Sequence, residues 1–185
     1  MRKLKLQMQI TVDGHVAGPQ GQLDWMTFDM DERLLGFINE MIDTSDTILL
    51  GRKMTTGFVN YWEDVVSKPQ SPEYAFGQKM VRTAKIVFSR TVDQMNGKNI
   101  HVETGDLVEA VNRLKRQTGN DLIVYGGATF VSSLIDHGLI DELNLFVNPV
   151  AIADGMRIFH HRRPLALTRS TVYPCGIVVN TYQPK

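Results

Sequence analysis

Apolar and polar residues alternate at the start of the chain, from Leu4 to Val12. A repeat of two residues is typical of a β-strand that buries one face, and Asp13-Gly14 ends the repeat with a turn signal. The residues that follow, from His15 to Asp24, are rich in glycine and proline. We expect a strand followed by an irregular loop.

Further along, apolar residues recur at the spacing of an amphipathic helix. The helices predicted in this way cover residues 34–42, a segment that begins at Lys53 or Met54, residues 73–82, residues 107–115 and residues 130–135. Acidic residues at 29–32 precede the first of them, where negative charge suits a helix N-terminus.

Short apolar runs separate these helices. The predicted strands cover residues 47–50, 85–89, 100–102, 121–125, 143–147 and 177–182. Uninterrupted apolar runs indicate strands buried on both faces, and the repeated order of strand, glycine turn and helix indicates a mostly parallel sheet with helices on both faces. The last two strands are joined through a loop at 151–163 without an obvious helix, so we expect an antiparallel C-terminal strand. The whole chain, residues 1–185, is expected to form one α/β domain.

Composition narrows the class of protein. The chain has 20 Lys and Arg residues and 20 Asp and Glu residues, so its formal net charge is zero. A nucleic-acid-binding surface needs a surplus of basic residues, and a membrane span needs about 20 apolar residues in succession. Cys175 has no second cysteine with which to pair. We therefore expect a cytoplasmic protein without a leader segment that binds a small molecule rather than nucleic acid or membrane.

Three predicted strands run into glycine or arginine. They end at Gly51-Arg52-Lys53, at Ser89-Arg90 and at Gly126-Gly127. Open α/β sheets bind ligands beyond the carboxyl ends of their strands, where glycine lets backbone N–H groups approach a phosphate and arginine adds charge. The pattern predicts a nucleotide site built from several strands, although each glycine alone also fits a simple tight turn. The spacing of Gly14 and Gly18 does not match the usual dinucleotide fingerprint, and Gly57 does not belong to a phosphate-binding Walker loop.

The chain resembles dihydrofolate-reductase-like proteins, and among these the C-terminal reductase domain of the bifunctional riboflavin-biosynthesis protein RibD. The blocks that carry the resemblance are, in order, residues 11–18, 48–53, 86–90, 124–127 and 141–143. The resemblance implies a three-layer sandwich that binds NADPH across its strand ends and passes hydride to a heterocyclic or sugar-like substrate.

The resemblance also implies roles for particular residues. Ala17 would border the nicotinamide, and the phosphate-binding residues would be Gly51, Arg52, Lys53, Ser89, Arg90, Gly126, Gly127, Ala128 and Thr129, with Ser89 and Arg90 at the adenosine 2′-phosphate. Met54 stands where the family usually has threonine, and Thr55 is the alternative phosphate contact.

On the substrate side, Asp29, Asp31 and Glu32 compete for the place of the carboxylate in dihydrofolate reductases, and Asp31 is our choice. Acids in this position also simply offset a helix dipole. The resemblance places Trp25, Thr27 and Arg33 near the substrate, and Trp25 equally fits a core anchor.

These expectations favour an NADPH-dependent reductase, nominally of 5-amino-6-(5-phosphoribosylamino)uracil. Dihydrofolate reduction and nucleotide binding without catalysis are the alternatives. We expect no metal site, because the adjacent His160 and His161 of an extended segment point to opposite faces. The family often forms homodimers through its C-terminal strands, and residues 143–147 would suit such an edge or an internal strand.

Overall fold

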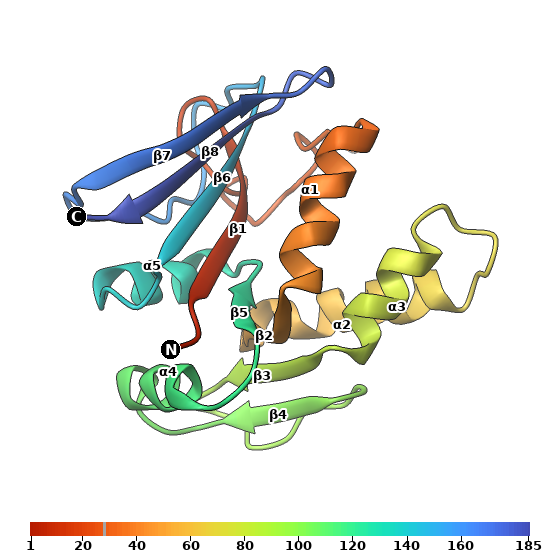
Figure 1. Ribbon diagram of the computed structural model, residues 1–185, viewed down its shortest axis with the longest axis vertical. Helices are drawn as coiled ribbons and strands as arrows, with labels where there is room; N and C mark the ends of the chain where they lie inside the picture. Colours follow the sequence, from red (N-terminus) through yellow and green to blue (C-terminus); the bar gives the residue numbers. More distant parts are fainter. Residues whose placement is uncertain (28) are drawn as a thin grey trace.

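The computed structural model describes residues 1–27 and 29–185, which form an eight-stranded sheet with helices on both faces (Figure 1). The strands are β1 (Leu4–Thr11), β2 (Ser45–Gly51), β3 (Ala84–Phe88), β4 (Ile100–Glu103), β5 (Asp121–Val124), β6 (Glu142–Asn148), β7 (Leu165–Val172) and β8 (Val178–Pro184). The helices are α1 (Glu32–Asp43), α2 (Arg52–Val66), α3 (Tyr74–Arg82), α4 (Leu107–Arg116) and α5 (Ala128–Asp136).

The strands lie in the order β4-β3-β2-β5-β1-β6-β8-β7. Strands β1 to β6 are all parallel, and β8 is antiparallel to both of its neighbours, β6 and β7. The predicted mixed, mostly parallel sheet with an antiparallel C-terminal strand is therefore confirmed.

Two hydrophobic cores lie on opposite faces of this sheet. Helices α4 and α5 pack on the face that carries Leu4 and Leu6 of β1, and α1, α2 and α3 pack on the face that carries Ile48 and Leu50 of β2. The three-layer arrangement with helices on both faces is confirmed.

Local sequence signals set the helix ends. Asp106 comes directly before α4, and its carboxylate accepts hydrogen bonds from the backbone N–H groups of Val108 and Glu109. Basic residues occupy the last turn of the same helix, next to the negative end of its dipole. These two signals explain why the predicted and observed bounds of α4 nearly coincide.

In the C-terminal region the structure adds a strand that was not predicted and decides between two alternatives. Strand β7 was not predicted, because both of its faces are open to solvent and its residues do not alternate: Leu167 is 57% and Val172 is 70% exposed. Residues 143–147 lie in β6, between β1 and β8, so they form an internal strand and not a free edge. The free edge at this side of the sheet is β7.

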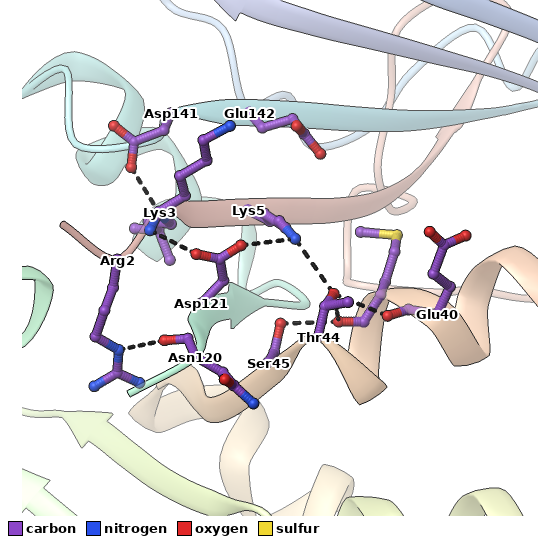
Figure 2. A network of polar contacts seen from close by, with 12 residues as sticks. Arg2, Lys3, Lys5, Glu40, Thr44, Ser45, Asn120, Asp121, Asp141 and Glu142 are labelled. Atoms are coloured by element: carbon purple, nitrogen blue, oxygen red, sulfur yellow. Dashed lines mark hydrogen bonds and ion pairs between the residues drawn. The ribbon is translucent and has the colours of Figure 1, made fainter. Parts of the chain in front are cut away.

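Polar contacts join the parallel strands at the end of the sheet where they begin, which we call the amino edge (Figure 2). Arg2 donates to the carbonyl of Asn120 and forms an ion pair with Asp46, the second residue of β2. Lys5 forms an ion pair of 2.8 Å with Asp121 at the start of β5, and Asp141 accepts from the backbone N–H of Leu4. This edge is therefore held together by charges.

No helix within residues 1–27 and 29–185 is long and apolar enough to cross a membrane.

Candidate functional site

The glycine turns after β2 and β5 meet at the carboxyl edge of the sheet. The two strands are parallel neighbours, and the helices that follow them, α2 and α5, lie on opposite faces. A Cβ atom placed on Gly127 would lie 3.9 Å from Cα of Gly51, and one placed on Gly51 would lie 2.7 Å from Cβ of Phe130. Because an open α/β sheet binds ligands where the chain leaves neighbouring strands toward opposite faces, this contact marks the candidate site.

The N-termini of both helices are open at this contact. Gly51 and Gly127 are the N-cap residues, and neither supplies a side chain to cap the first backbone N–H groups. Uncapped N–H groups at the positive end of a helix dipole suit an anion. The backbone of Gly126 and Gly127 has φ angles of 151° and 83°, a region that favours glycine, so this turn depends on its sequence.

Three exposed cations lie at the carboxyl edge of the sheet, directly after β2 and β3. Arg52 and Lys53 lie in the first turn of α2, and Arg90 follows β3, the strand next to β2. Among residues 1–27 and 29–185, none of the three forms an ion pair. Their charges are therefore available to a ligand.

Ser89 shapes the turn that presents Arg90. Its hydroxyl oxygen accepts hydrogen bonds from the backbone N–H groups of Thr91 and Val92 at 3.2 and 3.1 Å, and the residue is buried. Among the residues that the structure describes, the hydroxyl proton has no acceptor, so it is available to a ligand. Ala128 and Thr129 form the first turn of α5, next to Gly127, so the structure brings the predicted phosphate-binding residues of β2 and β5 together.

Thr55 and Met54, in the first turn of α2, make contacts within the protein. Thr55 is fully buried, and its hydroxyl donates to the carbonyl of Gly51 at 3.1 Å, within helix α2. The Sδ atom of Met54 lies 3.5 Å from the position of a Cβ on Gly126, so its thioether covers the glycine turn. The phosphate contact by Thr55 stays a prediction without support from this geometry.

The loop after β1 is attached to the loop after β6. Ala17 and Met156 form an isolated antiparallel bridge, in which Met156 N–H donates to the carbonyl of Ala17 at 2.8 Å. The carboxylate of Asp13 accepts from the backbone N–H groups of Ile152 and Ala153 at 3.1 and 2.7 Å. Ala17 is thereby held at the carboxyl edge of the sheet, on the same edge as the glycine turns.

Charged groups reinforce this attachment. A hydrogen bond from the hydroxyl of Thr11, followed by those from the other loop, holds the pKa of Asp13 well below its usual range despite partial burial. His15 is buried, its Nδ1 lies 3.4 Å from the carboxylate of Asp13, and its Nε2 accepts from Nε of Arg157 at 3.3 Å. The sequence interpretation missed His15, although an aspartate two residues before it was a usable signal.

Asp31 caps helix α1. Its Oδ1 atom accepts from the backbone N–H groups of Arg33 and Leu34, and its Oδ2 atom accepts from that of Cys175 in the turn between β7 and β8. Burial raises the pKa of Asp31, but these hydrogen bonds outweigh it and leave the pKa below its usual range. Capping is thus the role that the structure gives Asp31, and its catalytic role stays a prediction. Asp29 and Glu32 are exposed.

The segment before α1 lies over the ends of β1 and β6. The backbone N–H of Thr27 donates to Oδ1 of Asn148 at 3.3 Å, and Nδ2 of Asn148 donates to Oε1 of Gln9 at 2.7 Å. The indole nitrogen of Trp25 is buried without a hydrogen-bond partner among the described residues. Arg33 instead lies over the ring of Tyr173, at 5.9 Å from its centre.

A family model described as the RibD C-terminal domain matches residues 2–179. The chain belongs to this family. A relative, the uncharacterized protein YyaP of Bacillus subtilis (strain 168), is 31% identical in an alignment of 186 residues. The alignment covers 98% of this chain and 94% of that protein.

Solved structures confirm the fold of this RibD C-terminal domain. A putative riboflavin biosynthesis protein from Shewanella sp. PV-4 matches with a TM-score of 0.70 and 21% identity over 100% of this chain and 99% of that chain. The diaminohydroxyphosphoribosylaminopyrimidine deaminase/5-amino-6-(5-phosphoribosylamino)uracil reductase of Thermotoga maritima matches with a TM-score of 0.68 and 16% identity, over 100% of this chain and 57% of that one. Dihydrofolate reductase from Enterococcus faecalis, complexed with NADP(H) and RAB-propyl, matches with a TM-score of 0.60 and 18% identity over 99% and 96%. The dihydrofolate-reductase-like fold is therefore confirmed.

Proposed function

We propose that this RibD C-terminal domain is an NADPH-dependent reductase of a small heterocyclic substrate, nominally 5-amino-6-(5-phosphoribosylamino)uracil. The observation that carries the proposal is the contact between two uncapped helix N-termini at Gly51 and Gly127, with three exposed cations at the same edge of the sheet. A ligand with several phosphate groups fits these residues. The family match, the reductase named in the Thermotoga maritima protein and the NADP(H) named in the Enterococcus faecalis complex support the same proposal.

Each part of the site has a task in this reaction. The N–H groups of α2 and α5 would receive the pyrophosphate, and Arg52 and Lys53 would offset its charge. Arg90 would bind the adenosine 2′-phosphate with its planar guanidinium, and the free proton of the Ser89 hydroxyl would add a hydrogen bond. NADPH, when bound, supplies the hydride.

The remaining residues position and enclose the reacting groups. The bridge between Ala17 and Met156 would close one side of the site against water. Asp31 accepts three backbone hydrogen bonds and has a lowered pKa, so at neutral pH its Oδ atoms carry no proton to donate. Asp31 is therefore not a ready source of the proton that accompanies the hydride.

The test is steady-state loss of NADPH fluorescence with 5-amino-6-(5-phosphoribosylamino)uracil, together with a titration of NADPH alone. We expect micromolar binding of NADPH and turnover that depends on the pyrimidine. If the protein neither binds NADPH nor consumes it, the proposal is wrong.

Nucleotide binding without catalysis is the second candidate. The commitment of Asp31 to capping and the thioether of Met54 over the glycine turn favour it. Tight NADPH binding without turnover on a panel that includes the pyrimidine and dihydrofolate would select this candidate over the reductase.

A further inference from the structure

The central strand β1 carries polar side chains on the face that α1 covers. Strands buried on both faces of a parallel sheet are normally apolar on both. In β1 the residues on the α5 side are apolar, but the alternate positions on the α1 side are Lys5, Gln7 and Gln9. Lys5 is explained by its ion pair with Asp121. A break in pattern at the centre of a sheet indicates a functional position, so Gln7 and Gln9 require an explanation.

Gln7 and its neighbour Tyr125 both have a buried polar atom without a hydrogen-bond partner among the described residues. The register places Leu6 opposite Val124, so Gln7 of β1 lies beside Tyr125 at the end of β5, on the same face. Oε1 of Gln7 and the hydroxyl of Tyr125 are both buried, and neither has a hydrogen-bond partner in the described part of the chain. Burial raises the pKa of Tyr125, so its hydroxyl keeps its proton and is a donor.

Unpartnered buried atoms are uncommon, and a ligand that completes their hydrogen bonds explains them. Both residues are partly exposed although the named atoms are not, so the pair lies near an opening. Tyr125 also directly precedes Gly126 and Gly127. The pair therefore adjoins the edge at which the cofactor is proposed to bind.

Other polar residues on this face are satisfied. Asn144, opposite Gln7 on β6, donates to Glu142 at 3.0 Å and accepts from the hydroxyl of Thr181 at 2.8 Å. Asn144 on β6 thus has its partners, whereas Gln7 and Tyr125, at the seam between β1 and β5, lack theirs among the described residues.

Gln9 extends the polar surface toward the carboxyl edge. Its Oε1 atom accepts from Asn148, which leaves its amide nitrogen to donate. The seam then presents an acceptor, Oε1 of Gln7, together with donors, the Tyr125 hydroxyl and the amide nitrogens of Gln7 and Gln9. The carboxylate of Asp31 is engaged elsewhere, since it accepts from the backbone N–H groups of Arg33, Leu34 and Cys175.

We propose that Gln7, Gln9 and Tyr125 select the substrate by binding the edge of an uncharged heterocycle that offers both N–H and C=O groups, such as a pyrimidinedione. Asp31 takes no part in this recognition. The inference rests on the proposed function, since it takes the seam to be the substrate side of the reductase site.

Calorimetric titration of the protein with two probes, with and without NADPH, tests the proposal. The first is 5,6-diaminouracil, a neutral pyrimidinedione, and the second is 2,4-diaminopyrimidine, a ring that protonates readily and prefers a carboxylate. We expect the wild-type protein to bind the first probe more tightly than the second. Tyr125→Phe and Gln7→Leu should each weaken binding of 5,6-diaminouracil about tenfold, the loss of one hydrogen bond.

Thermal unfolding separates recognition from a merely structural role. Tyr125→Phe and Gln7→Leu remove atoms that have no partner, so their melting temperatures should equal or exceed that of the wild type. Asn144→Leu is the matched control on the same face. It removes satisfied hydrogen bonds, so it should lower the melting temperature and leave the affinity for 5,6-diaminouracil unchanged in the folded protein.

Three results would overturn the proposal: wild-type protein that binds neither probe, unchanged affinity in both seam variants, or preference for 2,4-diaminopyrimidine that Asp31→Asn abolishes. Failure of the proposed function has a different signature. There, 5,6-diaminouracil would bind with the expected variant pattern even though NADPH is not bound or not consumed.

Discussion

At the residue scale, Asp13 joins two loops that lie far apart in the sequence, and its low pKa makes this attachment depend on pH. Because the folded pKa lies below the unfolded value of about 3.9, the carboxylate stabilises the fold above that pH, and this contribution is lost as the pH falls toward the folded pKa. We expect Asp13→Asn to lower the melting temperature at pH 7, and the difference from the wild type to shrink below about pH 4.

Differential scanning calorimetry from pH 3 to pH 8 measures this difference. Asp93→Asn, at an exposed position of the loop after β3, is the control and should follow the wild type at every pH. A constant difference between Asp13→Asn and the wild type across the range would contradict the assignment.

Arg90 gives a second prediction at this scale, about cofactor choice. A guanidinium bound to the 2′-phosphate contributes to NADPH binding and not to NADH binding, since NADH lacks that phosphate. Arg90→Ala should raise the Kd for NADPH by about 10- to 100-fold, the range for hydrogen bonds to charged groups, and leave the Kd for NADH nearly unchanged. Fluorescence titration measures both constants, with the exposed Arg116→Ala as control. Equal losses for the two nucleotides would mean that Arg90 does not bind the 2′-phosphate.

Sequence alone predicted some of these residues and not others, for a physical reason. Gly51, Arg52 and Arg90 follow apolar runs directly, so local pattern places them at strand ends. The contact between His15 and Arg157 joins residues 142 positions apart, and no local pattern encodes it. The cap by Asp31 could be expected from an acid before a helix, but its bond to Cys175 could not.

At the element scale, helix α2 contains two glycines with opposite expected effects. Gly57 is exposed in the helix interior with nothing near its Cβ position, whereas a Cβ on Gly51 would meet Phe130 of α5. Gly57→Ala should stabilise the protein by about 0.5–1 kcal/mol through helix propensity. Gly51→Ala should destabilise it by about 1–3 kcal/mol through overpacking, and should weaken NADPH binding by separating the two helix ends.

Urea denaturation measures both free energies of unfolding, and Gly57→Ala is the matched control for the same substitution in the same helix. If Gly51→Ala were as stable as the wild type, the close approach of α2 and α5 would be wrong.

Lys85 of β3 closes the end of helix α3. Its Nζ atom donates to the carbonyls of Val81 and Thr83 at 3.1 and 2.8 Å. Burial lowers the pKa of Lys85 to about 8, against a smaller opposing effect of Glu63. Between about pH 8 and the unfolded value of about 10.4, the unfolded chain binds more protons than the folded one, so stability should rise with pH.

Lys85→Met lacks this titration. The melting temperature of the wild type minus that of Lys85→Met should therefore increase between pH 8 and pH 10, as measured by circular dichroism. Lys98→Met, at an exposed position, should show no such trend relative to the wild type. A difference that falls with pH would contradict the lowered pKa.

The elements themselves were predicted where one face or both faces are buried. Strand β2 is an apolar run because β3 and β5 flank it and helices cover it, and α4 has clear periodicity and a cap. Strand β7 has neither signal, since it lies at the edge with both faces open. Strand β7 forms because it pairs with β8, and its own residues carry no pattern that predicts this pairing.

At the scale of the whole molecule, the two edges of the sheet have separate tasks. The amino edge holds the charge network around Arg2, and the carboxyl edge holds the candidate site. Arg2→Ala removes the ion pair with Asp46 and the hydrogen bonds to the carbonyl of Asn120 and the hydroxyl of Thr47, and should cost about 2–3 kcal/mol of stability. The affinity of the folded protein for NADPH should not change. Urea denaturation and NADPH titration below the transition measure the two quantities. A parallel loss of affinity would show that the edges are coupled.

The oligomeric state and the cytoplasmic location stay predictions. A homodimer that continues the sheet would have to use one of the edge strands, β7 or β4, since β6 is internal. Sedimentation velocity measures the oligomeric state directly.

The position of β1 has a consequence for how the protein is made. Strand β1 leaves the ribosome well before the strands that flank it, β5 and β6, which begin only at Asp121 and Glu142. The nascent chain therefore carries an unpaired strand with an apolar face through most of its synthesis, and the insertion of β1 between its late partners is a long-range step of the kind that slows folding. The nascent chain should therefore need chaperones until β6 has emerged from the ribosome.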